Sequence, residues 1–356
     1  MAIPKKNHLV GLDVGSHSIK LVEIDHSKRG PILKSFGVVG LPPDAIVEGS
    51  IKEIEVVASA IKNLYKNLKV KNRKVATSIS GYSVIVKKIE LPTKEGGDFE
   101  ATIQEKAEQY IPFDINDVNL DYDLLTPESE EASADSSKPT EVMLVAAKKD
   151  MVEEYVGLLQ LAGLSPMVLD VDAFALQNAF EMSSPDQKGC YALVNIGAEE
   201  LGINAVKDGI SMFTRDSSYG GAQITEAIMK ELKVSYEEAE KIKLGGTKVE
   251  KEKAILEEIF TSVVSSWAQE IKRALDFLAT TYPDETIQRV FLSGGSSRIP
   301  GFQKYLEMET GIPVEMLNPF SNLVINEKKF DTRYLSYMAP QAAVAVGLAL
   351  RSIGDK

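Results

Sequence analysis

The stretch that decides the fold of this chain reads Val10-Gly11-Leu12-Asp13-Val14-Gly15-Ser16-His17-Ser18-Ile19-Lys20-Leu21-Val22-Glu23-Ile24. An apolar run at 9–12 predicts a strand that delivers Asp13 to a turn of small residues, and 19–24 predicts a second strand. Backbone N–H groups and hydroxyls of such a turn can point at a phosphate. Asp13 is then placed to hold a divalent cation through water. Because ordinary hairpins also read Asp-x-Gly-Ser, the stretch needs partner segments before it indicates a site.

Composition predicts a globular protein of more than one lobe. The chain has 356 residues, of which 44% are hydrophobic and 26% charged, and this length exceeds what one hydrophobic core usually serves. The formal net charge of −12 is spread along the chain, which disfavours nucleic-acid binding and an unaided polybasic attachment to lipid. Cys190 is the only cysteine, which excludes an intrachain disulfide framework and a Cys-x-x-Cys metal site.

Because the sequence predicts neither a signal peptide nor a membrane span, we expect a cytoplasmic protein by elimination. The first seven residues are basic and polar, with no apolar segment after them, so no signal peptide is expected. No run reaches the ~18 apolar residues of a membrane span, so we expect no direct membrane insertion. The three histidines are expected at strand ends and turns and not in a metal cluster.

The first half of the chain predicts a lobe with a compact unit inserted into it. Hydrophobic periodicity and turn residues predict the following elements: a strand at 32–39, a helix at 53–69, paired strands at 75–80 and 83–91, a helix at 104–110, a strand at 120–125, a strand at 142–147 and a helix at 149–162. Between the last two strands, 126–140 is acidic, Ser-rich and without a large apolar residue, which predicts a mobile loop.

The second half repeats the opening pattern after a boundary at 183–186. Its predicted elements are, in chain order: a strand at 168–171 and a helix at 173–181 before the boundary, then strands at 191–196, 201–206 and 210–215, helices at 224–232, 235–242 and 252–282, a strand at 290–293 and a helix at 339–351. The last helix is apolar and rich in small residues, so we expect it to pack between the lobes. Two lobes that each begin with a phosphate-type turn would face each other across one nucleotide.

Further segments add nucleotide-type chemistry to the opening turn. Asn195 and Gly197 occupy the corresponding turn of the second half, and Gly220 and Gly221 open a helix, whose free N–H groups favour phosphate. Glu240 and Lys243 share one helical face, where they can contact ribose hydroxyls and a base. Gly294, Gly295 and Ser296 follow a buried strand, where glycines permit close approach of a flat ring. Each signal alone is also compatible with an ordinary turn or a solvated face.

The order and spacing of these segments resemble the actin-like ATPase superfamily, which implies an α/β fold of two RNase H-like lobes with ATP and Mg2+ between them. Within it, the chain resembles the PilM family of cytoplasmic type IV pilus assembly proteins, end to end. The residues that carry this resemblance are 11–16 with 19–23, 110–113, 141–148, 162–164 with 169–171, 219–221 and 293–297.

The resemblance implies a division into four parts. The first lobe is 8–75 with 166–189 and 337–356, and the inserted subdomain, which the related FtsA family shares and actin lacks, is 76–165. The second lobe is 190–225 with 290–336, and a helical subdomain is 226–289.

The resemblance also implies roles for single residues. Asp13 would order Mg2+, Gly15, Ser16 and Ser18 would contact the β- and γ-phosphates, and Lys20 would add a cation. Hydrolysing members begin the second phosphate turn with aspartate, whereas this chain has the uncharged Asn195, a poor metal ligand. Asp170 or Asp172 could still orient water, and both are equally compatible with strand-end caps. We therefore expect ATP to be a structural or switching ligand that is turned over slowly or not at all.

The partner implied by the resemblance is the N-terminal cytoplasmic segment of PilN, an inner-membrane protein, bound between the first lobe and the inserted subdomain. Such a chain would be peripheral to the inner membrane and would help link the pilus platform to its motor ATPases. One alternative is an FtsA-like division filament protein, which is disfavoured because residues 351–356 end the chain without a basic apolar helix. The other is a sugar-kinase-type phosphotransferase, for which no substrate-binding acid–base pair stands out.

Overall fold

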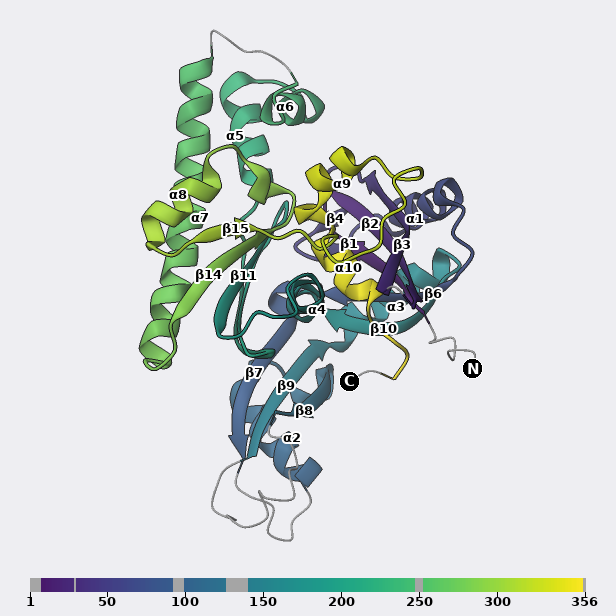
Figure 1. Ribbon diagram of the computed structural model, residues 1–356, viewed down its shortest axis with the longest axis vertical. Helices are drawn as coiled ribbons and strands as arrows, with labels where there is room; N and C mark the ends of the chain where they lie inside the picture. Colours follow the sequence, from purple (N-terminus) through teal and green to yellow (C-terminus); the bar gives the residue numbers. More distant parts are fainter. Residues whose placement is uncertain (1–7, 29, 92–98, 126–139, 247–251, 355–356) are drawn as a thin grey trace.

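The computed structural model describes residues 8–28, 30–91, 99–125, 140–246 and 252–354. Almost all of the predicted loop at 126–140 therefore lies outside the described residues. Figure 1 shows two α/β lobes side by side and a third, smaller unit that extends away from both. This arrangement confirms the predicted fold class.

The two lobes are built on five-stranded sheets of identical topology. The first sheet has the order β10-β6-β1-β2-β3, in which β1 pairs antiparallel with β2, and β6 and β10 continue in parallel. The second has the order β13-β12-β11-β14-β15 with the same pattern of directions. The repeated sequence pattern thus reflects a repeated topology. The strands are β1 Val10–Val14, β2 Ser18–Ser27, β3 Gly30–Gly40, β6 Lys74–Ile79, β10 Ser165–Val171, β11 Cys190–Ile196, β12 Leu201–Lys207, β13 Ile210–Ser217, β14 Ile287–Ser293 and β15 Val314–Met316.

Helices cover the sheets by burying apolar stripes. In the first lobe, α1 (Ile54–Leu68) and α3 (Lys149–Leu161) share one core with β1, to which α1 contributes Val57, Ile61 and Leu64 at helical spacing. Helix α1 ends at Lys69, whose left-handed backbone lets its N–H bond the last turn. A short hairpin of two strands with two residues each, β4 (Ile46–Val47) and β5 (Ser50–Ile51), precedes α1.

The second lobe becomes helical after its first three strands. Helices α5 (Ala222–Leu232), α7 (Lys253–Thr281) and α8 (Phe302–Thr310) pack around the fully buried Trp267, and α6 (Tyr236–Lys243) lies against α5. The predicted helices at 224–232, 235–242 and 252–282 are confirmed. None of the helices among the described residues has both the length and the apolarity to traverse a bilayer.

The inserted unit is a three-stranded antiparallel sheet covered by one helix. Its strands, in the order β7-β9-β8, are β7 Val84–Leu91, β9 Thr140–Lys148 and β8 Val118–Leu124, and its helix is α2 Phe99–Tyr110. The predicted pairing of strands 75–80 and 83–91 is wrong, because β6 pairs with β1 and β10 while β7 pairs with β9. A short 3-10 turn, Gly81–Ser83, separates the two strands.

The four-part division stays a prediction. Sheet membership favours an inserted subdomain smaller than 76–165, since β6 belongs to the first sheet and α3 to the first lobe's core. Among the described residues, β7, α2, β8 and β9 are the elements that share the core of the inserted unit.

The C-terminal helix lies between the lobes, as predicted, although it is shorter than 339–351. It follows α9 (Thr332–Met338) and a 3-10 turn at Pro340–Ala342, and as α10 it spans Ala343–Ala349 with every residue buried. Ala343, Val344 and Leu348 pack in one core with residues of both lobes, namely Leu9 and Ala76 of the first and Leu193 and Phe291 of the second. Helix α10 also packs on α4 (Asp172–Ser183), whose Ala175, Leu176 and Phe180 belong to the same core.

We expect Gly347→Ala to destabilise the protein, because a Cβ atom at Gly347 would lie 1.6 Å from the backbone oxygen of Ala175 on α4. The two helices would have to move apart to admit the methyl group. This overpacking should lower the free energy of unfolding by about 1–3 kcal/mol. Urea unfolding at one pH measures it.

The matched control is Gly157→Ala in α3, where no atom lies within 4 Å of the added Cβ. Removing a glycine from a helix interior there should stabilise by roughly 0.5–1 kcal/mol. Equal effects of the two substitutions would contradict the close packing of α10 on α4.

Candidate functional site

A cleft of about 1320 Å³ opens between the lobes and receives side chains from both. Most of the residues predicted from the sequence line it: Asp13, Gly15, Ser16, Ser18, Lys20, Asp172, Asn195, Gly197, Gly221, Glu240, Lys243, Gly294, Gly295 and Ser296. Gly220 and Asp170 do not appear in its lining.

The first wall of the cleft is the turn between β1 and β2. The N–H of Gly15 donates to the carbonyl of Ser18 at 3.3 Å, which closes the turn. Asp13 and Lys20 are opposite one another in the strand register, and the lysine Nζ lies 3.3 Å from Asp13 Oδ2. Gln341, from the segment before α10, donates to Ser18 Oγ at 3.2 Å. The turn thus presents a cation, hydroxyls and one carboxylate in a small space.

The second wall is the corresponding turn of the second lobe, 197–200, which joins β11 to β12. The N–H of Gly197 donates to the carbonyl of Glu200 at 2.8 Å, and the first turn of α5 hydrogen-bonds back to Gly197 and Ala198. A Cβ atom at Gly220 would lie 2.2 Å from the oxygen of Ala198. Gly220 therefore permits the start of α5 to approach the turn, and it acts through packing instead of lining the cleft.

Glycines also shape the gap between α5 and the loop after β14. Gly294 has a φ of +87°, and a Cβ there would lie 2.2 Å from the oxygen of Ile196. A Cβ at Gly221 would lie 2.4 Å from Ser296 Oγ, which itself donates to the carbonyl of Gly197 at 2.6 Å. Larger residues at these positions would fill the cleft or push its walls apart.

Glu240 and Lys243 form the predicted pair on α6. Ser235 caps this helix by accepting from the N–H of Glu238. Further along the helix, Lys243 forms an ion pair with Glu240, three residues before it. Lys243 Nζ also donates to Thr225 Oγ1 at 2.8 Å and to the carbonyl of Gly221 at 3.3 Å. The pair therefore joins α6 to the first turn of α5 while facing the cleft.

The structure corrects the interpretation of Asp170. This side chain is buried outside the cleft, where it pairs with Arg351 at 3.1 Å and accepts from the N–H of Val171. Alternate residues of a strand share a face, so a continuous strand would place Asp170 and Asp172 on the same side. The sequence alone could not show that β10 ends at Val171 and that Asp172 begins α4, where it does line the cleft.

Asp172 accepts a short hydrogen bond of 2.5 Å from Ser78 Oγ. It is the first residue of α4 and not its cap, because Val171 occupies that position. Burial raises the pKa of Asp172 to about 7, and the nearby charge of Asp13 acts in the same direction, while the Ser78 hydroxyl opposes it.

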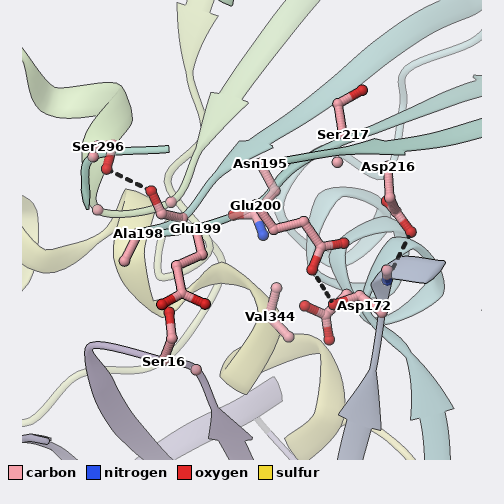
Figure 2. Close-up of a pocket in the computed structure, with 18 of the residues that line it drawn as sticks. Ser16, Asp172, Asn195, Ala198, Glu199, Glu200, Asp216, Ser217, Ser296 and Val344 are labelled. Atoms are coloured by element: carbon pink, nitrogen blue, oxygen red, sulfur yellow. Dashed lines mark hydrogen bonds between the residues drawn. The ribbon is translucent and has the colours of Figure 1, made fainter. Parts of the chain in front are cut away.

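Two further carboxylates were missed in the sequence as members of the site. Figure 2 shows Glu200 and Asp216 on the same side of the cleft as Asp172, away from Ser16 and Ser296. Burial raises the pKa of Glu200 well above its ordinary value, and the charges of Asp216 and Asp172 raise it further. Glu200 is the last residue of the second turn and could have been suspected, whereas Asp216 on β13 enters only through the pairing of β13 with β12.

Two hydrogen bonds cross the mouth of the cleft. The His17 Nδ1 and Tyr236 Oη atoms lie 3.1 Å apart, joining the first turn to α6. The N–H of Glu48, in the turn between β4 and β5, donates to Glu199 Oε2 at 2.8 Å. No group of three or more metal-ligating side chains is found among the described residues.

Comparison with known proteins agrees with this geometry. The family model described as "Type IV pilus assembly protein PilM" matches residues 11–353. A chain of the solved "PilM-PilN type IV pilus biogenesis complex" is 28% identical, covering 99% of this chain and 100% of that one with a TM-score of 0.86.

More distant solved structures share the fold alone. The ethanolamine utilization protein EutJ from Carboxydothermus hydrogenoformans is 17% identical, with 98% and 90% of the two chains covered and a TM-score of 0.56. MreB5 of Spiroplasma citri bound to AMPPNP is 11% identical, with 97% and 95% covered and a TM-score of 0.53. Since the family model spans nearly the whole chain, this protein belongs to the PilM family of type IV pilus assembly proteins.

Proposed function

We propose that this protein is an ATP-binding scaffold of the type IV pilus assembly platform and that it binds the N-terminal cytoplasmic segment of PilN. Membership of the PilM family supports the role in pilus assembly. The observation that most supports nucleotide binding is the cleft itself, in which two glycine turns, Lys20 and the Glu240–Lys243 pair converge from both lobes.

The residues of the cleft suit a nucleoside triphosphate with Mg2+. The backbone N–H groups of the two turns and the Lys20 ammonium would bind the phosphates. Asp13 would hold Mg2+ as its protein ligand, since Mg2+ commonly takes one or two carboxylates together with phosphate and water, and the ion would neutralise phosphate charge. Glu240 and Lys243 would contact the ribose, and the gap beside Gly294 and Gly295 would admit the base.

Slow turnover is supported by Asn195. Its Oδ1 atom accepts from Ser293 Oγ at 3.3 Å, so the amide is engaged by the neighbouring strand and offers no charge to a metal or an attacking water. Asp172 remains as a carboxylate that faces the cleft, but its Oδ1 already accepts from Ser78. ATP would therefore act mainly as a ligand that holds the two lobes together.

The partner segment would bind between the first lobe and the inserted subdomain. The solved complex of the similar PilM chain contains PilN. In this protein, the face of the inserted sheet that carries Val86 and Val145 packs toward the first lobe's core, and the cleft extends along it past Ile46 and Phe113. The net charge of −12 suits a basic juxtamembrane segment. Binding PilN would place the protein at the cytoplasmic side of the inner membrane, within reach of the motor ATPases.

Asp13→Ala should weaken binding of Mg2+-ATP at least tenfold, about 1.4 kcal/mol, because it removes the protein ligand of the metal. Isothermal titration calorimetry with and without EDTA measures the loss. Asp25→Ala, on the same sheet but paired with Lys34 outside the cleft, should leave the affinity unchanged. Rapid ATP hydrolysis by the wild type that Asp13→Ala abolishes would refute slow turnover.

Val86→Glu should weaken binding of a peptide of the PilN N-terminal segment at least tenfold, since a charge would enter the apolar face of the inserted sheet. Fluorescence anisotropy of a labelled peptide measures this. Val56→Glu is the matched control, because Val56 on α1 is already 38% exposed and lies outside the cleft. Absence of peptide binding to the wild type, with or without ATP, would refute the proposed partner.

Asp172→Asn should raise the stability of the nucleotide-free protein at pH 8 and much less at pH 5. The pKa of Asp172, about 7, exceeds its ordinary 3.8, so as the pH rises between these values the unfolded chain loses this proton first. In the wild type, the free energy of unfolding therefore falls progressively up to pH 7, and the full loss is present above it. The loss is on the order of a few kcal/mol and is shared with the neighbouring carboxylates. Thermal unfolding across pH 5–8 measures this. The exposed Asp186→Asn should show a flat difference, and a flat difference for Asp172→Asn would contradict the raised pKa.

A further inference from the structure

The turn 197–200 is hydrogen-bonded both to other segments of the second lobe and to the start of the inserted subdomain. Toward the second lobe, its backbone is held by Gly221, Ala222 and Ser296, which belong to the predicted nucleotide elements. Because these bonds are all to backbone carbonyls of Gly197 and Ala198, the turn cannot shift without moving the start of α5. A ligand that orders one of these elements would therefore order the others.

Toward the inserted subdomain, the same turn and the adjacent strand hold residues 80–82. Ser80 Oγ donates to Glu200 Oε2 at 2.9 Å, and the N–H of Gly81 donates to Asp216 Oδ2 at 3.1 Å. The Tyr82 and Ser218 hydroxyls are also hydrogen-bonded. Residues 80–82 connect β6 of the first sheet directly to β7 of the inserted sheet, so the second lobe contacts the inserted subdomain at its point of attachment.

Only a few residues separate the backbone of the turn, which bonds to α5, from the Glu200 side chain, which bonds to Ser80. Glu200 is three residues from Gly197, and its carboxylate lies beside Ser80, Asp216 and Gly81. A Cβ atom at Gly81, whose φ is +79°, would lie 3.4 Å from Glu200 Oε2. Gly81 thus lies within van der Waals reach of Glu200, and the hydrogen bonds of Ser80 and Gly81 hold residues 80–82 to Glu200 and Asp216.

We propose that the turn 197–200, acting through Glu200 and the adjacent Asp216, couples nucleotide binding in the cleft to the position of the inserted subdomain. This coupling rests on the proposed nucleotide site. Phosphate bound to the backbone of the turn orders Gly197 to Glu200, and Glu200 then orders Ser80 and Gly81, where the inserted sheet begins. By thermodynamic linkage, displacement of the inserted subdomain changes nucleotide affinity by the same factor.

Hydrogen exchange of the full chain, with and without AMPPNP and Mg2+, tests the coupling. The N–H of Gly81 reports directly, because its acceptor is Asp216 on the second lobe. We expect AMPPNP to slow its exchange at least fivefold, the lower end of typical coupling factors. In the double variant Ser80→Ala/Tyr82→Phe, which removes both side-chain bonds to the second lobe, the slowing should fall below twofold while the affinity for AMPPNP stays within twofold.

Glu199→Gln is the matched control on the same turn, because Glu199 contacts Glu48 of the first lobe and not residues 80–82. It should retain the full slowing at Gly81. A milder second variant, Tyr82→Phe alone, should give an intermediate slowing of exchange at Gly81. It keeps the coupling testable if the double variant does not fold.

Calorimetry on the same samples separates the outcomes. If AMPPNP binds and the exchange of Gly81 does not change in the wild type, or slows equally in the double variant, the coupling is refuted and the nucleotide site stands. If AMPPNP does not bind at all, the proposed nucleotide site and the coupling are both refuted.

Discussion

The close packing of α10 between the lobes is the constraint on which the rest of the structure depends. A Cβ atom at Gly11 of β1 would lie 2.1 Å from the oxygen of Ala345, and one at Gly347 would lie 1.6 Å from the oxygen of Ala175. Backbone therefore meets backbone on both sides of the helix, with no side chain to absorb a shift. Since α10 also shares a core with β11 and β14, it sets how the two sheets face each other and hence the width of the cleft.

Within that cleft, charges are divided between its two sides. Lys20 and Lys243 lie near the turns and the start of α5, while Asp172, Glu200 and Asp216 lie together on the side of the inserted subdomain. Burial raises the pKa values of these three acids, and neighbouring negative charges raise those of Asp172 and Glu200 further. An anionic ligand would find the ammonium groups of Lys20 and Lys243 beside the glycine turns of the first side.

Much of the fold could be predicted from the sequence because it depends on local patterns. Helical spacing predicted α1, α5, α6 and α7 almost to the residue, and the repeated strand–turn–strand pattern predicted two lobes of one topology. The same patterns did not show that β6 pairs with β1 and not with β7, because the partner of a strand is chosen by residues far away in the chain. Asp170 was misplaced for another reason: it would share a strand face with Asp172, and only the end of β10 at Val171 separates the two side chains.

The sequence by itself determined the chemistry of the site: glycines at the two turns, one carboxylate and one lysine on the opening hairpin, an uncharged Asn195, and an acid–base pair at helical spacing. Those features are short-range, so residue type and spacing are enough to define them. Tertiary structure alone decided that Glu200 and Asp216 meet residues 80–82, and that Gly220 serves close packing. The contacts of Glu200 and Asp216 join segments more than a hundred residues apart, and they need the two lobes to be held in one orientation, to which the packing of α10 contributes.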